Sequence, residues 1–340
     1  METYASGMNP AKCSLNLYAN FLIANQNRYS GLELERVTPV SGMSHDSVTR
    51  FLARSDYTSA DLWSVVEPLI KREGGYLICD DTLLNKQYSR HNELARVQYS
   101  GAEHGLVNGI CLVNLLWTNL RDDDVSEIVP VDYRIYDKKK EDKGPEAKTK
   151  NDHFRDMLDV AKDRKIKPNF VMMDSWYGSA ENLKHIASLG WNFMTNLKSN
   201  RQVSVEKGAY IAVTDLDFGA GNVRQVWLKE FGKVQVFRLV DKNGDTAYIA
   251  TNDLSLTDED EFRRHWLQRW RIEEFHRGIK QTAGVEKCYA TRAASQRTHI
   301  FAAIIAFIRL EVRRLKECIS WYEQKASITR YATARYLATA

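Results

Sequence analysis

Residues 266–280 place one carboxylate among several cationic side chains, at spacings that fit one face of a helix. Residues three or four positions apart share a helix face, and one stripe is therefore predicted to contain Trp266, Arg269, Glu273, Arg277 and Lys280. A carboxylate among cations suits a site that holds a metal ion and a phosphate group together. The alternative is a solvated helix face on which Glu273 forms weak salt bridges with its arginine neighbours.

Two further acids follow apolar runs that are predicted to be strands. Asp81 comes at the end of the run that starts at Tyr76, and Asp174 ends the run that starts at Phe170. Ligands of open α/β sheets bind beyond the carboxyl ends of the strands, and oxygen ligands suit Mg²⁺ or Mn²⁺. Each acid alone could simply end a strand or form a surface salt bridge. Their joint occurrence, in order, on a first strand, a fourth strand and a late helix predicts a metal site formed by Asp81, Asp174 and Glu273.

The elements that position these acids follow from the apolar pattern. Short helices are predicted over 15–24 and 31–37, followed by a turn and a helix that starts after Ser44. Helix, turn, helix is the outline of a DNA-binding motif, although two packed helices are common in any helical domain. In the DNA-binding interpretation, the residues that face DNA are His45, Asp46, Ser47, Thr49 and Arg50.

The central part of the chain alternates between strand and helix patterns, which predicts an α/β layered domain. Residues 198–253 show alternating β patterns between glycine-containing turns, which predicts an all-β insertion. Helix is expected again after Thr257, through the stripe and on through a basic amphipathic segment over 298–317. The expected domains are an N-terminal helical domain (1–70), a catalytic domain (71–197 and 254–317), the insertion (198–253) and a tail (318–340).

Composition and charge restrict the class of protein. The chain has 340 residues, of which 44% are hydrophobic and 27% charged, which is typical of a folded protein. From Arg263 onward there are 16 Lys and Arg against 6 Asp and Glu, which favours a polyanionic partner for this part.

The five cysteines form no C-x-x-C pair, so a reducing, cytoplasmic location is expected. The longest apolar run, 300–308, is shorter than the ~20 residues of a membrane span, and no membrane partner is expected.

The segment from Arg269 to Lys280 closely resembles the Y-x2-R-x3-E-x6-K signature of DDE transposases from bacterial cut-and-paste insertion sequences, those related to the insertion-sequence-four group. Glu273, Arg269 and Lys280 match its Glu, Arg and Lys, while Asp81 and Asp174 resemble the first two acids of the family. The resemblance extends over residues 76–280. It implies a ribonuclease H-like core, a mixed sheet flanked by helices, with a β insertion before the last acid.

The resemblance also implies an activity. Such a protein binds the terminal inverted repeats of its own element as double-stranded DNA, and two Mg²⁺ ions (or Mn²⁺) held by the three acids support cleavage of the ends. The freed 3′-hydroxyl then joins target DNA. Arg269 and Lys280 would hold phosphates, with Arg277 and Trp266 beside them on the stripe. Pairing two ends implies at least a homodimer in a synaptic complex, and a nucleoid-associated location is expected.

Several points stay open in the sequence. Trp266 stands where the signature has Tyr; it lacks the phenolic hydroxyl and could stack or pack instead. Asp81 is favoured over Asp80 because Thr82 follows it and because neighbours on a strand face opposite sides. Trp227 in the insertion could stack on a base, as in relatives that form a DNA hairpin, or could belong to the core.

Two other functions remain as alternatives to a transposase. One is a metal-dependent nuclease of the same fold without strand transfer, and the other is a domesticated, non-catalytic DNA-binding protein. The intact acids argue against the latter.

Overall fold

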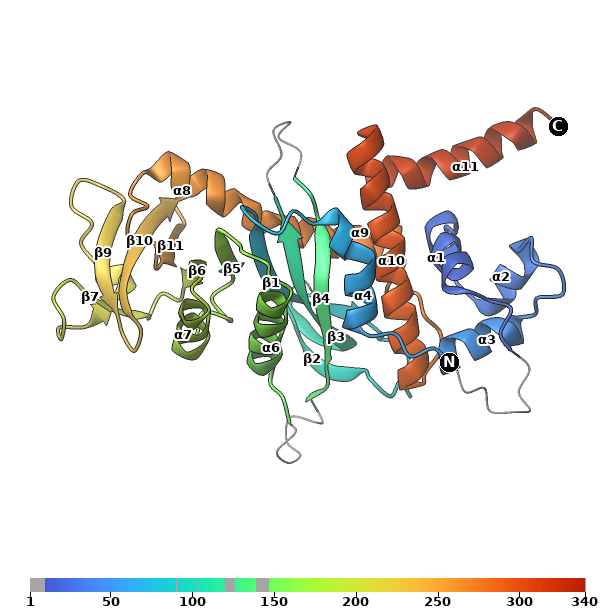
Figure 1. The fold of residues 1–340 in the computed structure, drawn as a ribbon, viewed down its shortest axis with the longest axis horizontal. Coiled ribbons are helices and arrows are strands. Elements are labelled where there is room, and N and C mark those ends of the chain that lie inside the picture. Colours follow the sequence, from blue (N-terminus) through green and yellow to red (C-terminus); the bar gives the residue numbers. More distant parts are fainter. Residues whose placement is uncertain (1–9, 90, 102, 120–125, 139–146, 340) are drawn as a thin grey trace. The chain divides into compact units, whose positions relative to one another are not determined.

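Figure 1 shows the computed structural model, which describes residues 10–89, 91–101, 103–119, 126–138 and 147–339. The chain folds as two compact units. The first unit consists of Met1–Val66, Leu83–Cys111 and Phe275–Ala340, and the second of Glu67–Thr82 and Leu112–Glu274. Neither unit is continuous in sequence, because each is completed by segments that are distant along the chain.

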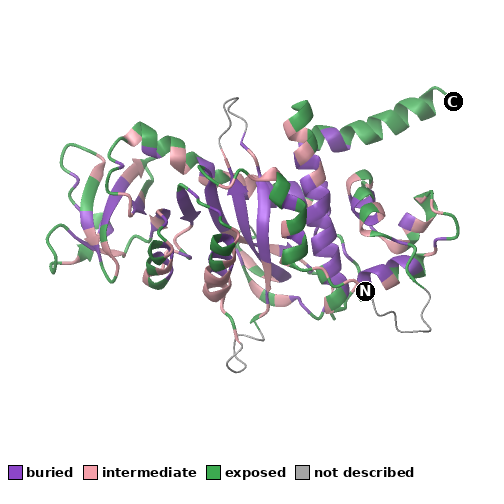
Figure 2. Cartoon of the chain, viewed as in Figure 1, coloured by how far each residue is buried: buried purple, intermediate pink, exposed green. Residues whose placement is uncertain are grey.

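The first unit is built around one long, apolar helix. Helix α10 (Ala293–Glu317) is buried along most of its length (Figure 2), because its segment from Ile300 to Ile308 is apolar on every side. Around it lie α1 (Leu15–Ala24), α3 (His45–Arg54) and α4 (Ser59–Val66), each in contact with α10. The same unit contains α2 (Gly31–Val37) and the strand β2 (Arg96–Ser100), which pairs with the first residues of β3 (Gly105–Thr118). Across the described ranges, no helix has both the length and the apolar composition that crossing a bilayer requires.

The N-terminal helices lie where the sequence predicted them, but one of the expected DNA contacts is wrong. Ser47 is buried, and its hydroxyl oxygen accepts hydrogen bonds from the backbone N–H groups of Lys12 (2.6 Å) and Cys13 (3.0 Å). It therefore fixes the segment before α1 and is not available to DNA. His45 pairs with Glu35 at 2.9 Å on the surface. The DNA-binding role of these helices, and of the half-buried Arg50, stays a prediction.

The predicted C-terminal tail is a helix. Helix α11 (Trp321–Leu337) begins at the N-cap Ser320, and its first turns are buried. The Lys325 ammonium donates to the Thr282 carbonyl and the Tyr29 hydroxyl, both at 3.0 Å, and burial lowers the pKa of Lys325 to about 8. Ser320 and Glu323 form a helix-start pattern that the prediction of a tail did not use, and the contacts of Lys325 with distant segments anchor the helix.

The second unit contains a mixed sheet with helices beside it. Strand β1 (Tyr76–Asn85) runs parallel to β5 (Phe170–Met173), and β5 runs parallel to β6 (Phe193–Leu197). Strand β3 lies on the other side of β1, and β4 (Val129–Tyr136) pairs with β3. Helices α6 (Lys150–Asp163) and α7 (Ala180–Ser188) pack against β4 and β6 respectively. This is the expected α/β class with a large mixed sheet.

The strands within 198–253 continue the same sheet. After β6 comes β11 (Thr246–Thr251), which pairs with it in antiparallel fashion, and then β10 (Gly232–Val240) and β9 (Val223–Leu228). Two short strands complete the order, β7 (Gln202–Ser204) and β8 (Ile211–Ala212). The all-β character was predicted from the sequence; the joining of β11 to β6 was not. Whether the segment forms a separate insertion domain stays a prediction.

The continuous helix predicted through the stripe is wrong. Helix α8 (Glu259–Trp266) is followed by a 3₁₀ turn (Leu267–Trp270) and then by α9 (Arg271–Thr282). A 3₁₀ turn has about 3.0 residues per turn, whereas an α-helix has about 3.6. The spacing of three and four residues therefore no longer places Trp266 and Glu273 on the same face of one helix. Phe262 of α8 stacks on Phe237 of β10 with ring centroids 3.9 Å apart, and this packing orients α8 against the sheet.

A buried histidine links three segments of the first unit. The Tyr18 hydroxyl lies 2.9 Å from His299 Nδ1, and His299 Nε2 lies 3.1 Å from the Gly284 carbonyl oxygen. The carbonyl can only accept, so Nε2 carries the proton and Nδ1 accepts from Tyr18. Burial lowers the pKa of His299 to about 3, because the fold has no room to hydrate an imidazolium.

This histidine should make the first unit sensitive to acid. Its pKa is lower in the fold than the usual value of about 6.5, so its contribution is complete above that pH and is lost as the pH falls from about 6.5 towards 3. The free energy of unfolding should fall by up to about 1.4 kcal/mol per pH unit in this window. Urea denaturation at several pH values should show a flatter profile for His299→Gln. Substitution of the exposed His91 by Gln should leave the pH dependence of the free energy of unfolding as in the wild type. The same pH dependence in the His299 and His91 variants would show that His299 is not the acid-sensitive group.

Candidate metal and nucleic-acid site

The three predicted acids all belong to the second unit. Asp81 lies on β1, Asp174 follows β5 directly, and Glu273 lies in the first turn of α9. The pairing of β1 with β5 ends at Cys79 and Met173. Because the two strands are parallel, the acids that come next lie at the same edge of the sheet.

A fourth acid, Asp80, lies among the same charges. Burial, together with the charges of Asp81, Asp174 and Glu273, raises the pKa of Asp80 to about 8. Burial also raises the pKa of Asp174, against the hydrogen bonds from the Tyr177 and Trp176 backbone. The charges of acids on β1, after β5 and on α9 thus contribute to the raised pKa of Asp80.

Both carboxylate oxygens of Asp81 have protein partners. The Lys150 ammonium lies 2.7 Å from Oδ2, and the Tyr177 hydroxyl donates to Oδ1 at 2.9 Å. The ammonium also lies 5.2 Å from the Trp176 ring centroid and 5.6 Å from that of Tyr136, within the range of cation–π attraction. Lys150 is thus held beside Asp81 by a charge and two aromatic rings.

The turn after Asp174 is fixed by its own side chain. Asp174 Oδ1 accepts from the backbone N–H groups of Trp176 (2.9 Å) and Tyr177 (3.2 Å), as in an Asx-turn. The Thr195 hydroxyl of β6 donates to the Asp174 carbonyl at 3.1 Å. A Cβ atom at Gly178 would lie 2.8 Å from Thr195 Oγ1, so a glycine is needed for this close approach. The sequence alone predicts only a turn at residues 175–178 and not its role beside the acids.

Glu273 keeps its arginine neighbour in spite of the 3₁₀ turn. Arg269 Nη2 lies 3.2 Å from Glu273 Oε1, and the Arg269 guanidinium lies 5.5 Å from the Trp266 ring centroid. Glu274 pairs instead with Arg271 at 2.8 Å. Arg269 and Trp266 therefore stay close to Glu273 through local contacts.

The last two residues of the stripe belong to the first unit. The Lys280 ammonium donates to the Leu83 carbonyl at 2.9 Å and lies 3.5 Å from Glu286 Oε1. Arg277 is exposed. Lys280 thus has a structural role, which joins α9 to the residues of β1 that lie in this unit. Its predicted contact with a phosphate stays a prediction.

The acids provide the type of ligand that Mg²⁺ and Mn²⁺ prefer, which is carboxylate oxygen. Among the residues that the structure describes, no three His, Cys, Asp or Glu side chains lie in an arrangement that could hold a metal ion. At Asp81 the positive charge is provided by the Lys150 ammonium.

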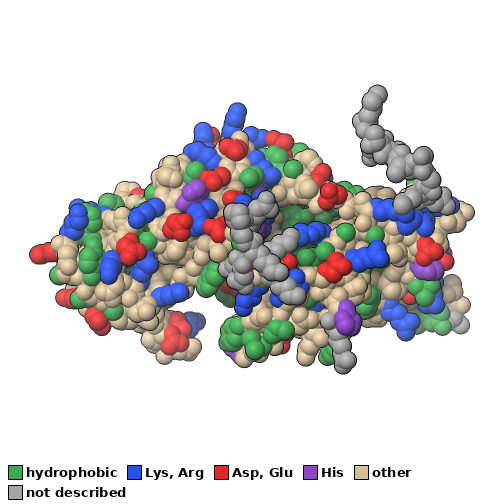
Figure 3. Space-filling view, turned by 90° about the horizontal axis from the view of Figure 1, so that it is seen from below, with side chains coloured by type: hydrophobic (Ala, Val, Ile, Leu, Met, Phe, Trp, Pro, Cys, Tyr) green, Lys and Arg blue, Asp and Glu red, His purple; other side chains and the backbone are tan. Residues whose placement is uncertain are grey.

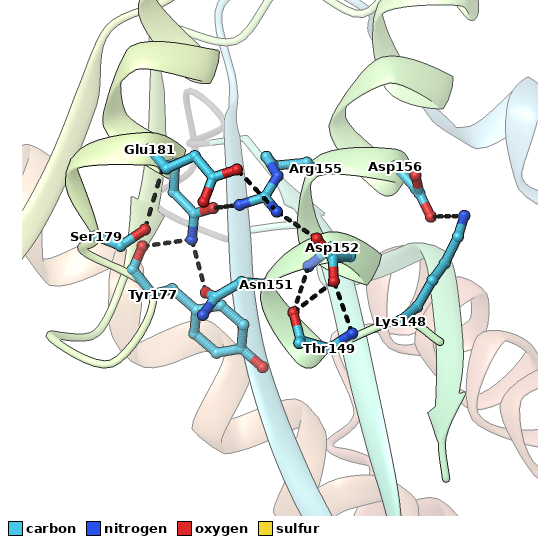
Figure 4. A network of polar contacts seen from close by, with 10 residues as sticks. Lys148, Thr149, Asn151, Asp152, Arg155, Asp156, Tyr177, Ser179 and Glu181 are labelled. Atoms are coloured by element: carbon cyan, nitrogen blue, oxygen red, sulfur yellow. Dashed lines mark hydrogen bonds and ion pairs between the residues drawn. The ribbon is translucent and has the colours of Figure 1, made fainter. Parts of the chain in front are cut away.

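A polar network between α6 and α7 supports the turn (Figure 4). The Asn182 side-chain amide donates to the Tyr177 carbonyl at 2.8 Å and to Asn151 Oδ1 at 2.7 Å. Arg155 donates to Asn182 Oδ1 at 2.7 Å and also pairs with Asp152, whose carboxylate forms a capping box with the Thr149 hydroxyl and backbone at the start of α6. The network therefore fixes the residue whose hydroxyl contacts Asp81.

Comparison with known protein families identifies the family to which the chain belongs. Residues 35–322 match the model of a family described as "Archaeal putative transposase ISC1217". The chain belongs to this DDE transposase family. No curated protein matches the sequence of this transposase. The family description names archaeal elements, whereas the sequence resemblance was to a bacterial group, and placement in the insertion-sequence-four group stays a prediction.

Asn182 should be important for the stability of the transposase. Its side chain is fully buried, so Asn182→Ala leaves the Tyr177 carbonyl and the Arg155 guanidinium each without one partner. The free energy of unfolding in urea should fall by about 1–3 kcal/mol. Lys184→Ala on the exposed side of the same helix is the control. Equal free energies of unfolding for the two variants would show that the hydrogen bonds of Asn182 make no net contribution to stability.

Proposed function

We propose that the transposase binds the terminal inverted repeats of its own element, cleaves the ends and joins their 3′-hydroxyls to target DNA. The observation that carries this proposal is the parallel pairing of β1 with β5, which brings the acids after the two strands to one edge of the sheet in a chain of the DDE transposase family. Acids from neighbouring strands suit the binding of metal ions that act on a phosphodiester.

In this proposal Asp81, Asp174 and Glu273 hold two Mg²⁺ ions, with Mn²⁺ as a substitute. Bound metal lowers the pKa of water and stabilises the charge on the leaving oxygen. The protein orients these acids: Tyr177 and Lys150 position Asp81, the turn of residues 174–177 positions Asp174, and Arg269 positions Glu273. When Lys150 leaves Asp81, it becomes a cation available to a phosphate.

DNA is the proposed partner, with a homodimer that pairs two ends in a nucleoid-associated synaptic complex. Arg269, Trp266, Arg277, Lys280 and Arg50 are the proposed contacts, chiefly with phosphates. On the face shown in Figure 3, lysine and arginine side chains are interspersed with acidic ones, so net charge alone does not define the path of DNA.

Trp227 remains a proposed contact for a base. Its ring on β9 is half-buried and lies 5.1 Å from the Lys207 ammonium and 5.4 Å from that of Lys233. Aromatic rings beside cations occur where single strands bind. A hairpin intermediate on the DNA end is not implied by these contacts.

The two alternatives differ from the proposal in their products. Purified protein incubated with end DNA, a target plasmid and Mg²⁺ should give joined target. Cleavage without joining would instead support a nuclease, and bound but uncut DNA would support a non-catalytic binding protein.

Removal of one charge at Asp174 should separate binding from cleavage. Asp174→Asn keeps the acceptor oxygen for Trp176 and Tyr177 but weakens metal binding. Mutation of residues that only support metal ligands already lowers metal affinity or activity by about 10–100-fold. Loss of a ligand should therefore lower the cleavage rate by more than ~100-fold, while the variant still shifts the mobility of end DNA. Asp245→Asn, which removes the same charge from an exposed residue, is the control. Undiminished cleavage by Asp174→Asn would remove Asp174 from the site.

The two acids of β1 can be distinguished by the same assay. Asp81→Asn should abolish cleavage, whereas Asp80→Asn should retain a measurable rate. With its pKa at about 8, Asp80 is mostly the neutral acid at pH 7, and Asn resembles that form. Rates are compared at equal Mg²⁺ after thermal unfolding has confirmed that both variants fold. The opposite pattern, with Asp80→Asn inactive and Asp81→Asn active, would transfer the role to Asp80.

A further inference from the structure

A small cavity lies directly beside the turn that follows Asp174. Its volume is about 190 Å³, well above the ~30 Å³ that one water molecule occupies in the liquid. It is bounded by the ends of β5 and β6 and by the start of α7. The lining residues are Ser175, Trp176, Gly178, Ser179, Asn196, Leu197, Lys198 and Arg201. Two of these side chains are cationic and none is acidic, so the lining favours an anion.

Arg201 is the least satisfied cation of this cavity. Its Nε and Nη2 atoms are buried and have no hydrogen-bond acceptor among the described residues. Burial lowers the pKa of Arg201, and the charge of Glu230 opposes this effect only in part. Because a buried guanidinium without acceptors is costly, an anion in the cavity that Arg201 lines would be attracted to its uncompensated charge.

Lys198 and Arg201 also line a second cavity of about 290 Å³. Its other lining residues are Asn200, Gln202, Lys229 and Glu230. Cationic side chains thus continue from the end of β6 to the turn after β9, with Glu230 as the one acid among these lining residues. A chain of repeating anionic groups fits such a path better than a single small anion.

Neutral donors complete the first cavity. The Ser179 hydroxyl oxygen accepts from the Asn182 backbone N–H at 3.2 Å, so its own hydrogen can be donated elsewhere. Ser175 and Asn196 add a hydroxyl and an amide. Hydroxyl and amide donors beside Lys and Arg are the groups that contact phosphates in DNA complexes.

Trp176 connects this cavity with the acids. The side chain is 44% exposed, it lines the cavity, and its ring also lies beside Lys150, the partner of Asp81. An exposed aromatic ring next to cations is the combination that binds single-stranded nucleic acid, because every base can stack on such a ring.

We propose that the cavity of Lys198 and Arg201 binds a phosphate group of the DNA strand that the acids cut, a short distance along the strand from the cleaved bond. Trp176, between the cavity and Asp81, offers its ring to a base of the same strand. The proposal rests on the proposed function, since it assumes that DNA reaches the acids. It adds a second contact point that fixes which phosphodiester is presented to them.

Fluorescence anisotropy of a labelled single-stranded oligonucleotide tests the site without any requirement for cleavage. The variants Lys198→Ala and Arg201→Gln should each bind several-fold more weakly. The slope of log affinity against log salt should fall by about 0.7 for each, the value for one lost phosphate contact on a single strand. Lys242→Ala, an exposed lysine in the turn between β10 and β11, should leave affinity and slope unchanged. Thermal unfolding confirms that the variants are folded.

Tryptophan fluorescence gives a second readout and distinguishes two sources of phosphate. The oligonucleotide should change the emission of the wild type more than that of Trp176→Phe, and inorganic phosphate should change it only weakly. Equal affinity and salt slope for Lys198→Ala, Arg201→Gln and the wild type would overturn the proposal. So would tight binding of inorganic phosphate that the oligonucleotide does not displace. A wild type that binds through this cavity but never cuts DNA would contradict the proposed function and leave the binding site in place.

Discussion

Parallel pairing of β1 with β5 is the constraint on which the site depends. Backbone hydrogen bonds hold the two buried strands in register up to Cys79 and Met173, and these bonds cannot be given up without exposing unpaired polar groups to an apolar core. The acids that follow each strand are therefore held together although they repel. The raised pKa of Asp80 is a direct result of this arrangement, through its burial and through the neighbouring charges. A cation relieves this repulsion, and at Asp81 the Lys150 ammonium does so.

The arrangement around Asp174 shows how neutral hydrogen bonds support the charged site. Asp174 closes its own turn, Asn182 holds the Tyr177 carbonyl, and the Tyr177 hydroxyl reaches Asp81. A chain of hydrogen bonds thereby connects α7 with an acid on β1. If these acids hold metal ions, as proposed, such support would orient them before substrate binds.

Opposite charges are placed at two sides of the same turn. Before the turn lie the acids, which suit metal ions, and after it lie Lys198 and Arg201, which suit a phosphate. Trp176 lies between the two and contacts both the cavity and Lys150. In the proposed function, this separation of charge would provide one place for the metal ions and another for the DNA strand.

The local features of the chain could be predicted from sequence because they depend on short-range periodicity. The bounds of α1 and α2, the strands β1, β4, β5 and β6, and the β character of residues 202–251 follow from apolar spacing and turn residues. The strand β2 was not predicted. The positions of Asp81 on β1, Asp174 after β5 and Glu273 on a helix also followed from the sequence, while their role as metal ligands stays a prediction.

Other features were decided only by contacts between distant residues. Lys150 and Asp81 are 69 positions apart, and nothing near either one indicates their pairing. Ser47 looked like a DNA contact, but it holds the segment before α1. The 3₁₀ turn after Trp266 and the helix α11 depend on what packs against them. Side-chain periodicity is a property of a few consecutive residues, whereas burial, pairing and pKa depend on which remote segments the folded chain brings together.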